Sequence, residues 1–178
     1  MFKSFILAAF ALCLAFGSQA QTRNNTTSTP SRATVANNTR EKAAVQTFGL
    51  SIIEAYFRRD CDFVWNRLAD PIRSVESGQT FAKTPDVKTE LCGENPLRTD
   101  IAVSYQMYQQ NYQPRVLSQA EFAQQYPQIQ QSLQLQVGDY YFDGSQPKQA
   151  GATSVFRASD MARFVVRKNG SSWLIIAM

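Results

Sequence analysis

Residues 52–76 read I-I-E-A-Y-F-R-R-D-C-D-F-V-W-N-R-L-A-D-P-I-R-S-V-E, and this stretch decides the fold. In it a helix ends, a short helix begins and a strand follows. Asp60 is the predicted N-cap of the short helix. Pro71 is predicted to end that helix, because proline cannot continue it. The strand is then expected over residues 72–76.

The helix that ends in this stretch is predicted to be long and to run over residues 40–59. Apolar residues recur there at intervals of three and four and form one stripe, which includes Val45, Phe48, Ile52 and Tyr56. At 1.5 Å per residue such a helix would be roughly 30 Å long, so we expect it to be a platform on which the domain packs. Residues 21–39 are rich in Thr, Asn, Ser and Arg, which predicts a disordered polar linker.

The first twenty residues have the pattern of a signal peptide. Lys3 supplies a positive charge, residues 5–16 are an almost unbroken apolar run, and small residues at Ser18 and Ala20 predict cleavage after Ala20. The apolar run is too short for a stable membrane anchor, and no later segment approaches about 20 consecutive apolar residues. We therefore expect a secreted or periplasmic protein with no membrane anchor after cleavage.

Two cysteines remain after cleavage, Cys61 and Cys92, because Cys13 leaves with the signal peptide. An even count in an oxidising compartment predicts a disulfide between them. Closing a loop of that size would stabilise the folded protein by roughly 3 to 4 kcal/mol. The competing interpretation is a redox or nucleophilic thiol, but the chain has no C-x-x-C motif and no histidine to lower a thiol pKa.

Composition excludes several classes of function. The chain has 178 residues, a formal net charge of +4 and no histidine. Its basic residues are scattered, so a nucleic-acid partner is not expected. Without histidine there can be no Ser-His-Asp or Cys-His site and no histidine zinc ligand. Nucleotide-binding glycine motifs do not occur either. We therefore expect neither a cofactor nor a metal.

Further elements are predicted downstream. A third helix should begin at the cap Thr84 and run to about Leu91. Alternating apolar residues then predict strands over residues 101–108 and 133–142. Two short motifs are more specific. Ser118 and Glu121 form a capping box for a small helix that Pro127 should end. The dipeptide Asn169-Gly170 joins two strand-like runs in a type I′ hairpin, over residues 161–166 and 172–177.

This order predicts an α+β domain over residues 40–178, with a long N-terminal helix and two short helices packed on a curved antiparallel sheet. The order, and the run D-C-D-F-V-W-N-R-L-A-D over residues 60–70, resemble the nuclear-transport-factor-type cone superfamily. That superfamily includes the ketosteroid isomerases and the SnoaL-like polyketide cyclases, in which an acidic turn leads into a short helix ending in F-A-D-D. The resemblance implies a cystatin-like cone and a homodimer through the sheet.

The same resemblance implies site residues. Counted without gaps from Asp60, Glu76 falls where the isomerases place their general-base aspartate, and Asp70 is a second candidate base. The tyrosine that the isomerases use as an oxyanion donor corresponds to Ile52, with Tyr56 one turn further on. The later strands offer no obvious second acid.

Two functions are therefore expected. The first is an exported, non-catalytic domain that binds a small apolar ligand in its cone or contacts a protein partner. The residues expected to line the cone are Tyr56, Trp65, Phe81, Tyr105, Met107 and Phe164. The alternative is an isomerase- or cyclase-like enzyme with Glu76 or Asp70 as its general base. Ordinary core packing is the competing interpretation for the aromatic residues.

Overall fold

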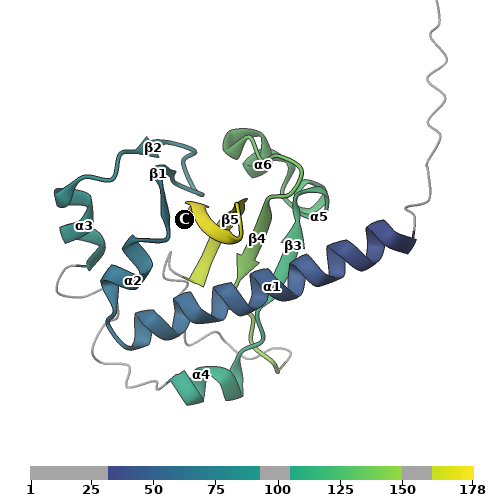
Figure 1. Ribbon diagram of the computed structural model, residues 1–178, viewed down its shortest axis with the longest axis horizontal. Coiled ribbons are helices and arrows are strands. Elements are labelled where there is room, and N and C mark those ends of the chain that lie inside the picture. The colour runs from purple at the N-terminus through teal and green to yellow at the C-terminus, as the bar shows by residue number, and fades with distance from the viewer. Residues whose placement is uncertain (1–31, 93–104, 150–161) are drawn as a thin grey trace, which may run out of the picture. The chain divides into compact units, whose positions relative to one another are not determined.

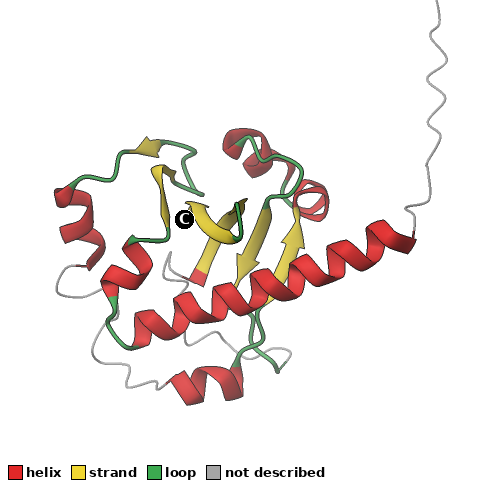
Figure 2. Cartoon of the chain, viewed as in Figure 1, coloured by secondary structure: helices red, strands yellow, loops and turns green. Residues whose placement is uncertain are grey.

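The computed structural model describes residues 32–92, 105–149 and 162–178. The predicted signal peptide, most of the predicted linker and the start of the strand predicted at residue 101 lie outside the described residues. Figures 1 and 2 show the arrangement of the helices and strands. In chain order they are α1 Arg32–Phe57, α2 Cys61–Trp65, β1 Leu68–Arg73, β2 Thr80–Phe81, α3 Pro85–Cys92, α4 Tyr105–Asn111, β3 Arg115–Ser118, α5 Gln119–Gln125, α6 Pro127–Leu133, β4 Tyr140–Asp143, β5 Arg163–Asn169 and β6 Ser172–Ala177.

The six strands form one curved sheet in the order β2-β1-β6-β5-β4-β3. The predicted α+β class is confirmed, with one difference: β1 runs parallel to β6, and the other neighbouring pairs are antiparallel. Both faces of the sheet carry a hydrophobic core. Alternate residues of a strand point to opposite faces, so one strand can contribute to both cores. Tyr140 and Phe142 of β4 belong to a core with α1, whereas Tyr141 belongs to a second core with Phe122 of α5 and Leu133 of α6.

Helix α1 begins at Arg32, eight residues before the predicted start. Five of the eight residues 32–39 are polar, but the segment follows Pro30 and contains no helix breaker of its own. Contacts with the sheet hold this end of the helix. The Tyr140 hydroxyl donates to Glu41 Oε2 at 2.8 Å and lies 3.3 Å from Asn38 Oδ1. The last eight of the 19 residues predicted as linker are therefore helix.

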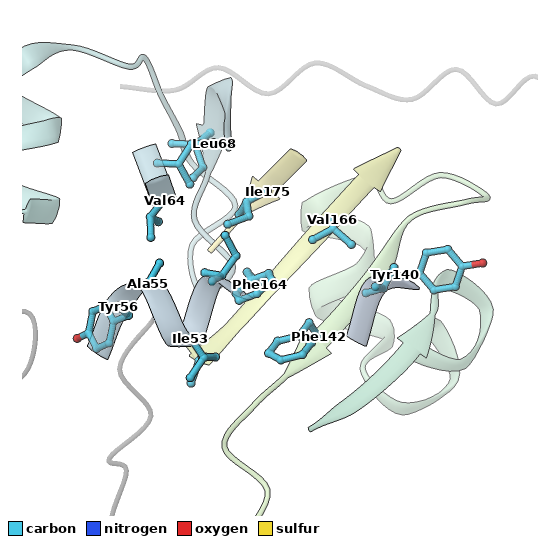
Figure 3. Packing of buried hydrophobic residues seen from close by; sticks show 14 of the residues in the cluster. Ile53, Ala55, Tyr56, Val64, Leu68, Tyr140, Phe142, Phe164, Val166 and Ile175 are labelled. Carbon is cyan, nitrogen blue, oxygen red and sulfur yellow. The ribbon is translucent and has the colours of Figure 1, made fainter. Parts of the chain in front are cut away.

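The acidic turn after α1 forms as predicted, but the strand after it begins earlier. Asp60 caps α2 by accepting a hydrogen bond from the Phe63 backbone N–H at 3.0 Å. The prediction that Pro71 ends a helix is wrong, since Pro71 lies inside β1. It is tolerated because the β1–β6 pairing is irregular between Leu68 and Arg73, where no ladder N–H is required. Leu68 packs beside Ile175 of β6 (Figure 3).

One predicted strand is helix where the structure describes it, and another forms only at its end. Residues 105–108 belong to α4, where the ring of Tyr108 stacks on Tyr105 at 6.0 Å and on Tyr112 at 5.4 Å. That spacing of three and four residues favours a helix once the rings meet. Similarly, α6 reaches Leu133, the left-handed Gln134 ends it, and no strand covers residues 133–137 in this described part of the chain. Of the predicted strand over residues 133–142, only the end forms, as β4.

The third helix, the capping box and the C-terminal hairpin are confirmed, with one difference in the turn of the hairpin. The third helix is capped by Thr84 Oγ1, which accepts from the Val87 N–H at 3.3 Å, and it ends at Cys92. The capping box of α5 has both of its hydrogen bonds. The predicted hairpin between β5 and β6 forms, but the type I′ turn is wrong: Asn169 pairs with Ser172, so the turn residues are Gly170 and Ser171, and of these Gly170 alone has a positive φ, +61°. A type I′ turn needs positive φ at both positions, whereas glycine at the first position is typical of type II′. Strand β6 lies inside the sheet, between β1 and β5.

A buried ion pair positions the loop before β4. Asp139 is 1% exposed and accepts hydrogen bonds from Arg167 Nε and Nη2, each at 2.7 Å, and from the Gln136 N–H at 2.8 Å. The hydrogen bonds to this carboxylate raise the pKa of Arg167. The pair links β5 to the segment that follows α6, so it fixes where α6 lies against the sheet.

Asp139→Asn is expected to lower the free energy of unfolding by about 2 kcal/mol, because a neutral amide cannot accept from both guanidinium nitrogens as a carboxylate does. Urea denaturation measures the change. The matched control is Glu90→Gln, which alters an exposed carboxylate on α3 and should leave the urea midpoint unchanged. An Asp139→Asn midpoint equal to that of the wild type would contradict this role.

Candidate functional site

The side of the sheet that faces α1 is occupied by core packing. Tyr56 and Phe164, two residues predicted to bind a ligand, are buried in the first core, and in Figure 3 the ring of Tyr56 points away from Phe164. Phe164 stacks on Phe142 with the ring centroids 4.8 Å apart. Trp65 is half-buried against the same core, with the Lys83 ammonium 4.9 Å from its ring centroid. These residues act as packing residues.

The other predicted ligand residues lie on β2 and α4. Phe81 is 44% exposed on β2, and Met107 is 46% exposed on α4. Tyr105 is half-buried, with its ring 6.0 Å from that of Phe57. Asp70, the second candidate base, is exposed, and its Oδ1 accepts from the Lys83 backbone N–H at 3.0 Å. The structure therefore does not gather the predicted residues into one cone-shaped site.

A pocket lies on the opposite face of the sheet, beside α5 and α6, with a volume of about 350 Å³. Most of its wall is aromatic or aliphatic and consists of Val75, Phe122, Tyr126, Ile129, Tyr141 and Met178. Its polar lining consists of Ser74, Glu76, Asp143, Gln146 and Arg163. Of the residues predicted as catalytic or ligand-binding, Glu76 lines this pocket.

One wall of the pocket is the turn between β1 and β2. Gly78 has a φ of +71° and approaches α6 so closely that a Cβ there would lie 3.1 Å from the Cβ of Ser132. Arg73 Nη1 donates to the Leu133 carbonyl oxygen at 2.5 Å. These contacts hold the turn against α6. Glu76, which the turn carries, is exposed to water.

Aromatic rings from α5 and β4 form another part of the wall. The Phe122 ring lies 4.6 Å from that of Tyr141 and 5.1 Å from that of Tyr126. The Tyr126 hydroxyl accepts a hydrogen bond from Arg115 Nη2 at 3.1 Å. Burial, followed by the nearby Asp143 carboxylate, raises the pKa of Tyr141 to about 12. Its hydroxyl is therefore neutral at physiological pH and available as a hydrogen-bond donor.

The buried carboxylate of Asp143 is fully used within the protein. It accepts from the Ser145 N–H at 3.0 Å, from Ser145 Oγ at 2.6 Å and from Gln146 Nε2 at 2.6 Å. Two guanidinium groups flank it, with Arg163 Nε at 3.7 Å and Arg115 Nη2 at 4.0 Å. Asp143 thus positions polar groups around the pocket, and its charge is balanced by the two arginines.

No family model, curated protein or solved structure matches this chain. Within residues 32–92, 105–149 and 162–178 no group of three His, Cys, Asp or Glu residues could hold a metal ion. The helices formed by these residues include none that is long and apolar enough to cross a membrane. The pocket is therefore the feature of the described residues that bears on function.

Most of the pocket residues were not predicted from the sequence. Tyr126, Tyr141 and Arg163 come from α5, β4 and β5, which meet only because of the order of strands in the sheet. One signal was present in the sequence: residues 140–142 are three consecutive aromatic residues, and a run without alternation is typical of a strand covered on both faces. In the structure residues 140–143 are all buried.

Proposed function

We propose that this protein is an exported domain that binds a small molecule in the pocket beside α5 and α6, and not in a cone under α1. The observation that carries this proposal is the pocket of about 350 Å³, which joins an aromatic wall to a few polar groups. Small-molecule sites have this composition and volumes upward of about 300 Å³. Export is inferred from the signal-peptide pattern and from the disulfide.

A second candidate is the enzyme of the isomerase or cyclase kind. One observation favours it: Glu76, a proton acceptor, shares the pocket with the neutral hydroxyl of Tyr141, which could stabilise an oxyanion. The exposure of Glu76 favours binding over catalysis, because water solvates the carboxylate that would act as base. If the protein is an enzyme, it should convert a bound molecule to a product, and Glu76→Gln should abolish that conversion.

The cone-superfamily membership and the homodimer stay predictions of the resemblance. On one face of the sheet α1 contacts β3 and β4, and on the other face α5 does the same. A dimer through the sheet would therefore have to use the part nearer β1 and β6.

A thermal-shift screen of small molecules tests the binding proposal. A molecule present at 100 times its dissociation constant should stabilise the protein by about 2.7 kcal/mol, which raises the melting temperature by roughly 5 to 10 °C. Ile129→Trp should abolish the shift, because the larger ring occupies the pocket. Met107→Trp is the matched control, since Met107 is exposed on α4 and does not line the pocket.

The two variants also distinguish the sites. If Met107→Trp abolished the shift while Ile129→Trp retained it, the ligand would bind near the aromatic residues of α4, and the pocket proposal would be wrong. Absence of any shift across a chemically diverse screen would equally contradict it.

A further inference from the structure

The pocket carries two charged groups of opposite sign that keep hydrogen-bonding capacity. Glu76 forms no ion pair with any residue in the described part of the chain. Arg163 uses Nε for its contacts within the protein, with Ser145 Oγ at 3.2 Å and Asp143 Oδ1 at 3.7 Å. Its two terminal nitrogens make no hydrogen bond to the described residues. A ligand can therefore meet a carboxylate and a guanidinium that still have hydrogen-bonding capacity.

The topology brings these two groups to the same end of the sheet. Glu76 follows the end of β1, which runs parallel to β6, and Arg163 begins β5, which runs antiparallel to β6. The register aligns Arg73 and Val165 with the same residue, Ala177. One strand separates the two backbones, so they lie roughly 10 Å apart. Both side chains are long enough to meet one small molecule between them.

The other charges near the pocket are already balanced. Asp143 accepts hydrogen bonds from Ser145 and Gln146, and its single negative charge lies beside two guanidinium groups, those of Arg115 and Arg163. Arg115 does not line the pocket. Between Glu76 and Arg163, the wall is apolar and aromatic, with Phe122, Ile129 and Tyr141. The lining thus offers a cation site, an anion site and an apolar surface.

We propose that the ligand is a small zwitterion with an apolar body, whose ammonium group binds Glu76 and whose carboxylate binds Arg163. Two terminal guanidinium nitrogens match the two oxygens of a carboxylate, and the ammonium–carboxylate hydrogen bond is charge-assisted. The apolar body packs on the rings of Phe122 and Tyr141. This inference rests on the proposed binding function and narrows it to one chemical class.

Four related probes test the charge pattern at pH 7, by chemical-shift titration of the mature protein. They are phenylalanine, 2-phenylethylamine with only the amine, 3-phenylpropanoate with only the acid, and the uncharged N-acetylphenylalanine amide. Phenylalanine should bind about tenfold tighter than either single-charge probe, because each charge-assisted contact is worth about one factor of ten.

Two variants assign each charge to its residue. Glu76→Gln should weaken phenylalanine and 2-phenylethylamine about tenfold and leave 3-phenylpropanoate unchanged. Arg163→Gln should weaken phenylalanine and 3-phenylpropanoate about tenfold and leave 2-phenylethylamine unchanged. Glu90→Gln and Arg40→Gln, which change exposed charges away from the pocket lining, are the matched controls and should bind all four probes as the wild type does. Glu76 is exposed, so its variant should fold even if Arg163→Gln does not.

The outcomes separate this inference from the function on which it rests. Binding of the uncharged probe in the pocket as tightly as phenylalanine would overturn the zwitterion, as would an equal effect of Glu76→Gln on the amine and acid probes. If none of the four probes binds but other molecules from the thermal screen do, the zwitterion inference is wrong and the binding function stands. If no molecule of any charge binds in the pocket, the binding function itself is wrong.

Discussion

Gly49→Leu is expected to lower the free energy of unfolding by more than about 3 kcal/mol, the upper end of the usual cost of overpacking. Gly49 lies in α1 where the helix crosses the sheet, and a Cβ there would fall inside the van der Waals surface of the Phe142 ring. That ring cannot move aside easily. Phe142 is fully buried and stacks on Phe164 at an interplanar angle of 19°.

Gly49→Ala gives the sharper test because two effects predict opposite signs. Helix propensity alone would stabilise α1 by about 1 kcal/mol, since glycine is a poor helix former. The contact with Phe142 should outweigh this, so the alanine variant should unfold at lower urea than the wild type. Thr47→Ala, on the exposed face of the same helix, is the control and should be neutral or slightly stabilising.

A second substitution tests the contact itself. Phe142→Leu removes the ring, so it should reduce the cost of Gly49→Ala when the two are combined. If Gly49→Ala were as stable as the wild type, α1 would not lie against β4 as closely as the structure has it.

Features determined by neighbouring residues could be predicted from the sequence. The Asp60 cap, the capping box of Ser118 and Glu121, and the Asn169-Gly170 hairpin each depend on residues within four positions of one another, and all three are present.

Features decided by distant contacts could not be predicted. The alternation that predicted a strand over residues 101–108 is short enough to fit either period, and the stacking of Tyr105, Tyr108 and Tyr112 favours a helix. The pocket depends on the parallel pairing of β1 with β6, which places the β1–β2 turn at the same end of the sheet as the start of β5, one strand away. The sequence therefore singled out Glu76, which lines the pocket, but not the residues that line it with Glu76.

Replacing both Cys61 and Cys92 by serine is expected to lower the free energy of unfolding by about 3 kcal/mol, because the unfolded chain regains the entropy of a long loop. The predicted pairing is confirmed: the two cysteines, 31 positions apart, are joined with their Cα atoms 5.7 Å apart. Urea denaturation measures the effect, with dithiothreitol-treated wild type as the comparison. Thiol labelling with mass spectrometry of the mature protein checks the bond, and two free thiols would contradict it.

The effect on the folded state should be local to α3. This helix has no buried residue, and besides the disulfide it is attached by the exposed Lys88–Asp62 ion pair and by Leu91, which packs half-buried against the first core. An exposed ion pair contributes little, so the disulfide is its main attachment. In hydrogen exchange, the serine variant should lose protection in α3 and keep it in β5 and β6. Equal loss of protection in β6 would show instead that the bond supports the whole sheet.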